Sequence, residues 1–178
     1  MASTKSMSLD IGCGSQPRGD VNCDLFLGKS PHTKYVIKRC ENFVLCDAEW
    51  LPFKNSSFPI VHASHVMEHL PHPFNFLKEA KRVSSKIVYL QVPSLHFVTN
   101  QIIQPEHPLH IYTWGKYSFH NLLQRFFKHV KIYETQPNKP CTRVIRGRIL
   151  KKMGPIGRII SIMLKQFYFQ ELTAICEK

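Results

Sequence analysis

The chain has 178 residues, 43% of them hydrophobic, which is enough to bury the core of one domain spanning residues 1–178. It has neither an apolar run of about 18 residues nor an apolar N-terminal stretch, so the sequence predicts a cytoplasmic protein without a transmembrane segment and leaves peripheral membrane contact open. Its 24 Lys and Arg outnumber its 12 Asp and Glu, and the net charge of +12 favours anionic partners. The six cysteines form no CxxC pair, which argues against a zinc knuckle.

Apolar runs that recur along the chain predict seven strands, at 7–11, 21–25, 43–46, 60–63, 87–92, 130–133 and 172–176. Helical patterns between them are clearest at 74–83 and 116–127. Strands that alternate with helices predict an α/β fold with a mostly parallel sheet. We therefore expect a seven-stranded sheet that ends in a C-terminal antiparallel hairpin.

The first strand stops in a turn bracketed by glycines, because residues 9–14 read Leu-Asp-Ile-Gly-Cys-Gly. Glycines lack a Cβ, so this turn lets the backbone approach a ligand closely and predicts a cofactor pocket. The third glycine of the dinucleotide fingerprint is absent, since Pro17 stands nearby, and this disfavours a nicotinamide cofactor.

The connection from Gly14 to Val21 is short for a parallel α/β unit, because a parallel crossover normally takes a dozen or more residues. Either the first crossover helix is shortened to a turn or absent, or the first two strands are joined in another way. A shortened link leaves less protein around this end of the pocket.

A second informative block begins with Cys46-Asp47-Ala48-Glu49-Trp50-Leu51-Pro52-Phe53 and continues through residues 60–70, which read IVHASHVMEHL. Together with residues 9–14, this block resembles class I S-adenosylmethionine-dependent methyltransferases of the type 11 subgroup. The resemblance continues into residues 107–113 and covers most of residues 7–133. It implies the three-layer, Rossmann-like methyltransferase fold, with a mostly parallel seven-stranded sheet, and S-adenosylmethionine as the cofactor.

The resemblance also implies roles for individual residues. The glycine turn would hold the methionyl part of the cofactor beside Asp10, Asp24 would accept hydrogen bonds from the ribose hydroxyls, and Asp47 with the Ala48 amide would bind adenine. The expected cofactor-binding residues are Asp10, Gly12, Cys13, Gly14, Asp24, Leu25, Asp47, Ala48, Glu49 and His65. The structural alternatives are that Asp10 and Asp24 cap turns and that Asp47 caps a helix.

Methyl transfer is an in-line displacement, so the protein mainly aligns the reactants, and a general base helps only if the acceptor holds a proton. The candidates for that base, as catalytic residues on the substrate side, are His65, His69, His110 and Tyr112. His110 is also plausible as a structural histidine.

Residues 65–69, His-Val-Met-Glu-His, also match the H-x-x-E-H pattern of inverted zincins. A zinc protease needs these residues inside a sustained helix, but Pro71 and Pro73 interrupt the segment and a strand precedes it. A zinc hydrolase is therefore a remote alternative, and the sequence predicts no metal ligands.

Between Glu134 and Glu171 the chain contains no acidic residue. Apolar and basic residues there fall on opposite sides of a helical pattern, which predicts a basic amphipathic excursion at about 137–169. It could pack on its own domain, bind RNA or bind an anionic membrane, through Arg143, Arg146, Arg148, Lys151, Lys152, Arg158 and Lys165. A lid over the pocket is expected from this excursion or from residues 94–106.

The predicted function is transfer of a methyl group to an O or N nucleophile of a small-molecule, lipid or glycan acceptor. Residues 63–66, Ala-Ser-His-Val, stand where methylases of exocyclic base nitrogens carry N-P-P-[YF], which disfavours that activity. Methylation of RNA or protein through the basic excursion is one alternative. A non-catalytic module that binds S-adenosylmethionine is another.

Overall fold

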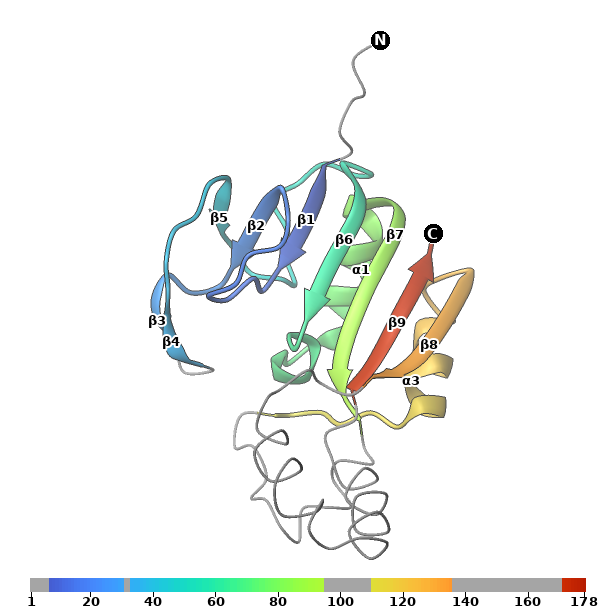
Figure 1. Ribbon diagram of the computed structural model, residues 1–178. Helices are drawn as coiled ribbons and strands as arrows, with labels where there is room; N and C mark the ends of the chain where they lie inside the picture. Colours follow the sequence, from blue (N-terminus) through green and yellow to red (C-terminus); the bar gives the residue numbers. More distant parts are fainter. Residues whose placement is uncertain (1–6, 31–32, 95–109, 136–170) are drawn as a thin grey trace, which may run out of the picture.

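A computed structural model describes residues 7–30, 33–94, 110–135 and 171–178. Seven strands form one sheet in the order β5-β2-β1-β6-β7-β9-β8 (Figure 1). Their bounds are β1 Ser8–Ile11, β2 Val21–Asp24, β5 Phe43–Leu45, β6 Phe58–Ser64, β7 Ser84–Pro93, β8 His129–Thr135 and β9 Glu171–Glu177. Neighbouring strands from β5 to β7 are parallel, and β9 runs antiparallel between β7 and β8. The predicted mostly parallel sheet with a C-terminal antiparallel hairpin is confirmed.

The connection between β1 and β2 contains turns and no helix, although the two strands pair in parallel. Side chains on the strands hold this link in place of a helix. The Asp20 carboxylate accepts hydrogen bonds from the backbone N–H and the hydroxyl of Ser8, and Asn22 exchanges two hydrogen bonds with the backbone of Gly19. The first crossover helix is therefore absent, and a polar network replaces it.

Two α-helices lie behind the sheet in Figure 1, α1 at Pro73–Val83 and α3 at Lys116–Leu123. Proline suits the first position of α1 because its missing N–H has no partner in the first turn of a helix. Phe76 and Leu77 of α1 and Phe119 of α3 are fully buried in one apolar core with alternate residues of the strands. The helix predicted at 116–127 is shorter than expected, because α3 ends at Leu123 and residues 124–126 form a turn.

The opposite face of the sheet has a different character. His62 of β6 stacks on Tyr89 of β7 with ring centroids 5.1 Å apart, and Ser64 donates to the Gln91 side chain, which donates to Thr173. Neither described α-helix packs on this polar, half-exposed face, so the second helical layer of the expected three-layer fold has no counterpart in the described part of the chain.

A small antiparallel sheet follows β2 and was not expected from the sequence. It consists of β3 at Gly28–Ser30 and β4 at Thr33–Ile37. Figure 1 shows this hairpin beside the carboxyl end of β2. Ser30 and Ile37 of this hairpin line a cavity at the carboxyl ends of the parallel strands.

Some of the regions singled out in the sequence lie outside the described residues. They are the basic excursion at 137–169 and nearly all of the 94–106 segment. The seven basic residues predicted to bind a polyanion and both candidate lids therefore lie outside the described residues. Among the described helices, none combines the length and the apolar character that crossing a membrane requires.

Candidate functional site

A cavity of about 560 Å³ opens at the carboxyl ends of the parallel strands. Its walls come from the turn after β1, the end of β2, the residues after β5 and β6, the 3₁₀-helix η1 at Met67–His69, and the β3–β4 hairpin. In open α/β sheets this edge is where ligands bind, and the volume suits a ligand of cofactor size.

The glycine turn after β1 forms one wall of this cavity. Gly12 has φ of 65° and Gly14 has φ of 56°, both in the left-handed region that glycine enters without steric cost. A Cβ on Gly12 would overlap the Val66 side chain, whereas a Cβ on Gly14 would meet no atom within 4 Å. Gly12 is therefore required both for the turn and for the close approach of residue 66.

Asp24, at the end of β2, is buried in the cavity wall and tied to the backbone on both sides. One carboxylate oxygen accepts the Gly14 N–H at 2.9 Å, and the other accepts the Phe26 N–H at 3.0 Å. An ionised carboxylate offers about four acceptor positions, so Asp24 keeps capacity for two further hydroxyl donors. The predicted neighbour Leu25 also lines the cavity, with its side chain half exposed.

The residues after β5 form the adjoining wall. Asp47 is exposed, and one of its carboxylate oxygens accepts the Glu49 N–H at 2.8 Å. The buried Glu49 carboxylate accepts the backbone N–H of His72 at 2.9 Å and lies 3.0 Å from its ring Nδ1. Asp47, Ala48 and Glu49 all line the cavity, but the Glu49 side chain is already engaged by His72.

Two predicted cofactor residues do not line the cavity. Asp10 is buried, and its carboxylate accepts the Arg18 N–H at 2.9 Å within the short first crossover. Burial raises the pKa of this carboxyl, and the hydrogen bond from Arg18 partly opposes the effect. Cys13 is also buried, and burial together with the charges of Asp24 and Asp10 raises the pKa of its thiol to about 12.

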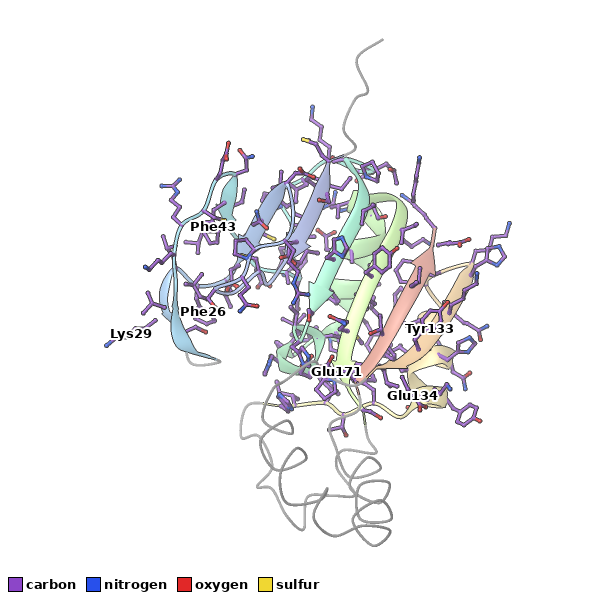
Figure 2. All side chains as sticks on the ribbon, in the orientation of Figure 1. Phe26, Lys29, Phe43, Tyr133, Glu134 and Glu171 are labelled. Atoms are coloured by element: carbon purple, nitrogen blue, oxygen red, sulfur yellow. The ribbon has the colours of Figure 1, made fainter. Side chains whose placement is uncertain are left out.

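His65 lies at the end of β6 in a constrained conformation. Its φ of 55° is unusual for a residue other than glycine and costs about 1–3 kcal/mol. Its ring Nδ1 lies 3.2 Å from Glu68 Oε1, and Nε2 lies 3.0 Å from Glu171 Oε1. Figure 2 places Glu171 at the start of β9, beside the carboxyl end of β7. The ring therefore connects η1, through Glu68, to β9, through Glu171.

The protonation of His65 follows from these contacts. Burial alone would lower the pKa of the imidazole, but the hydrogen bonds to Glu171 and Glu68 outweigh burial and raise the pKa to about 9. At neutral pH the ring is therefore protonated, and both nitrogens donate to carboxylates. In this arrangement His65 lines the cavity as a cation, without a free nitrogen to accept a proton.

The other three catalytic candidates are placed differently. His69 lines the cavity. His110 does not, but its ring packs edge-on against His69 with centroids 4.8 Å apart. Tyr112 also lies outside the cavity lining, and its hydroxyl donates to the Pro71 carbonyl at 3.2 Å. Only His65 and His69 of the four candidates therefore reach the cavity.

The H-x-x-E-H segment does not form the helix that an inverted zincin requires. Its only helical portion is the three-residue η1, and His65 precedes it in a left-handed conformation. The structure instead brings Glu68 and His69 together with His110, which is distant in sequence. The pattern of His and Glu in residues 65–69 was the only signal of this cluster in the sequence.

Other cavity residues were not expected from the sequence. Phe26, Ser30 and Ile37 bring in the β3–β4 hairpin, and Figure 2 shows Phe26 between this hairpin and the end of β2. The run Tyr35-Val36-Ile37 after Pro31 is the signal that could have predicted the hairpin, because β-branched and aromatic residues favour strands.

Comparison with known proteins agrees with this geometry. The family model described as a methyltransferase domain matches residues 22–90, which span β2 to most of β7. None of the curated proteins matches the chain significantly in sequence. The fold is that of S-adenosylmethionine-dependent methyltransferases, and the methyltransferase domain match supports an enzyme of that kind. The matched segment is consistent with the type 11 subgroup, and the similarity implies S-adenosylmethionine as the cofactor.

Three solved structures illustrate the similarity of fold. A SAM-dependent methyltransferase from Archaeoglobus fulgidus shares 20% identity at a TM-score of 0.61, with 96% of this chain and 85% of that chain covered. The complex between the Haloferax volcanii Trm112 methyltransferase activator and a methyltransferase matches at 14% sequence identity and a TM-score of 0.64. The match covers 99% of this chain and 84% of that chain. The [4+2]-cyclase SpnF matches at 12% sequence identity and a TM-score of 0.58, and the match covers 98% of this chain and 76% of that chain. At these identities the likeness concerns the fold alone.

Proposed function

We propose that this protein transfers the methyl group of S-adenosylmethionine to an O or N nucleophile of a small-molecule, lipid or glycan acceptor. The observation that carries the proposal is the cavity at the carboxyl ends of the strands, where a left-handed glycine turn and the buried Asp24 carboxylate stand side by side.

The residues present fit S-adenosylmethionine in chemical type. A Cβ on Gly14 would meet no atom within 4 Å, so the open space beside this residue lets the backbone of the turn lie against the methionyl part. Asp24 has unused acceptor capacity for two ribose hydroxyls. Asp47 keeps one carboxylate oxygen without a hydrogen bond to Glu49, which suits the adenine amino group, and the Ala48 amide lies next to it in sequence.

When bound, S-adenosylmethionine supplies a methyl group activated by its sulfonium. The chain contributes binding, orientation and exclusion of water, which are the main requirements of an in-line displacement. Ile11, Phe26 and Leu70 give the cavity apolar walls that remove water from the reactants. His69 reaches the cavity from η1, and we assign it the acceptor side.

Calorimetric titration with S-adenosylmethionine and S-adenosylhomocysteine tests the cofactor. We expect one binding site per chain for each compound. Absence of binding by both compounds at millimolar concentration contradicts the proposal, because the cavity would then serve another ligand.

Formation of S-adenosylhomocysteine during incubation with separate panels of small molecules, lipids, glycans, RNA and proteins tests the acceptor. Turnover with one of the first three panels supports the proposal, whereas turnover with RNA or protein alone favours the macromolecular alternative. Binding of the cofactor with no turnover on any panel favours a non-catalytic module. The salt dependence of binding to RNA, compared with that of binding to anionic vesicles, shows which of the two the positively charged protein, with its net charge of +12, binds electrostatically.

A further inference from the structure

Glu68 is the least ordinary side chain near the cavity. It is fully buried, with an exposed fraction of 0%. Its Oε1 lies 3.2 Å from His65 Nδ1, but its Oε2 is buried and has no hydrogen-bond partner. A buried carboxylate oxygen without a donor is costly, and buried charges in proteins are normally paired or coordinate a metal.

Two histidines stand next to this carboxylate. A ring nitrogen of His69, a ring nitrogen of His110 and a carboxylate oxygen of Glu68 all lie within 4.8 Å of one another. His69 follows Glu68 in η1, whereas His110 comes from a segment far along the chain. The Glu68 carbonyl accepts the backbone N–H groups of Ile111 at 2.8 Å and Tyr112 at 3.3 Å, and these bonds keep His110 beside η1.

We propose that Glu68, His69 and His110 form a binding site for a divalent transition-metal ion of the zinc class at the wall of the cavity. Two imidazoles and one carboxylate are a ligand set that suits such ions, whereas Mg²⁺ and Ca²⁺ prefer oxygen ligands alone. Metal–ligand bonds of about 2.0–2.2 Å place tetrahedral donors about 3.4 Å apart, so the three side chains close by about an ångström on binding.

The site would have three protein ligands and an open fourth position, as catalytic zinc sites do. Because His69 also lines the cavity, the ion would lie where the proposed acceptor enters. His65 does not belong to the ligand set, because its two nitrogens are engaged by Glu68 and Glu171, but it orients the Glu68 carboxylate from outside.

Zinc titration of the full chain, without a histidine tag and after treatment with a chelator, tests the site. We expect one saturable Zn²⁺ per chain by calorimetry and by metal content after dialysis. Glu68→Gln, His69→Gln and His110→Gln should each weaken zinc binding at least about tenfold, because loss of even an outer partner of a ligand costs 10- to 100-fold. His129→Gln, which changes an exposed histidine of β8, should leave zinc binding unchanged.

X-ray absorption at the zinc edge gives a second, independent readout. We expect nitrogen and oxygen neighbours without sulfur, because the proposed ligands are two imidazoles and a carboxylate. Sulfur neighbours would instead indicate that Cys23 and Cys46, which line the same cavity, bind the ion. Sulfur neighbours, no saturable zinc site, or zinc affinity that is unaffected in both His69→Gln and His110→Gln would each overturn the proposal. His110 is only half-buried, so its variant remains informative if Glu68→Gln does not fold.

Affinity for S-adenosylhomocysteine is measured on the same samples. Variants that lose zinc but still bind S-adenosylhomocysteine have an intact cavity, which assigns the loss to the metal ligands. A wild-type chain that binds zinc but neither cofactor compound contradicts the proposed function and leaves the metal site standing, so the two failures are distinguishable.

Discussion

The backbone N–H of Gly14 donates to the Asp24 carboxylate at 2.9 Å, which joins the turn after β1 to the end of β2. The two parts of the pocket that would hold the methionyl group and the ribose are therefore positioned by one hydrogen bond. This bond matters more here than in a fold with a first crossover helix, because only turns connect the two strands.

Asp24→Asn is expected to weaken binding of S-adenosylhomocysteine by about 10- to 100-fold. The change removes the charge from the Gly14 bond and from the acceptor of the ribose hydroxyls, and hydrogen bonds to charged groups contribute about 1.5–3 kcal/mol. Calorimetry measures the affinity. Asp20→Asn is the matched control, because Asp20 holds Ser8 outside the cavity and its loss should leave the affinity unchanged. Equal affinity in wild type and Asp24→Asn would show that Asp24 is not the ribose ligand.

Gly12→Ala is expected to lower the free energy of unfolding by at least about 2 kcal/mol, and Gly14→Ala by about 1 kcal/mol. Both positions have a positive φ, but only a Cβ at residue 12 overlaps Val66. Urea denaturation of both variants measures the difference. Equal losses would mean that residue 66 moves aside without cost.

Gly19→Ala is expected to destabilise the protein by about 3 kcal/mol, although no cavity residue changes. A Cβ there would lie 2.7 Å from the Asp10 backbone nitrogen and would overlap the Val21 carbonyl oxygen, and main-chain atoms cannot turn away as a side chain can. Thermal unfolding followed by circular dichroism checks the prediction. Wild-type stability in this variant would show that the first crossover is held less tightly than its hydrogen bonds indicate.

The pair Glu79 and Arg82 makes stability depend on pH. Arg82 donates to both carboxylate oxygens of Glu79 at 2.7 Å and to the carbonyls of Leu51 and Phe53. These bonds hold residues 51–53 against α1. The hydrogen bond from Arg82 holds the pKa of Glu79 below its usual value. The stabilisation is therefore complete above the usual pKa of about 4.3 and is lost as the pH falls through the lowered pKa.

Urea denaturation of wild type and Glu79→Gln from about pH 7 to pH 3 measures this contribution. We expect the variant to be less stable at neutral pH and the difference to shrink towards acid pH, where Glu79 of the wild type becomes protonated. Glu41→Gln, which changes an exposed carboxylate, is the control. A difference that is constant with pH would show that the charge of Glu79 contributes nothing.

Local patterns were sufficient for the parts of the molecule whose structure depends on neighbouring residues. The seven strands of the main sheet, the helix α1 and the glycine turn follow from hydrophobic periodicity and from the absence of a Cβ. Asp24 and Asp47 could be placed at one edge because the carboxyl ends of parallel strands meet there. The end of α3 was predicted less well, since apolar residues continue the helical pattern beyond Leu123.

Contacts between distant residues could not be read from such patterns. The resemblance implied Glu49 as a cofactor-binding residue, and the packing of two segments pairs its carboxylate with His72, which no local pattern predicted. The β3–β4 hairpin contributes Ser30 and Ile37 to the cavity, a placement that no local pattern in the sequence indicated.

The sequence by itself determined the class of fold and the edge of the sheet where the cofactor cavity lies, because hydrophobic periodicity and glycine positions act through local geometry. The tertiary structure decided which partners the histidines have. It pairs His65 with Glu171 of β9, and it brings His110 to Glu68 and His69 across a large sequence separation. Burial and hydrogen bonding between distant segments set these partners, and a linear pattern contains neither.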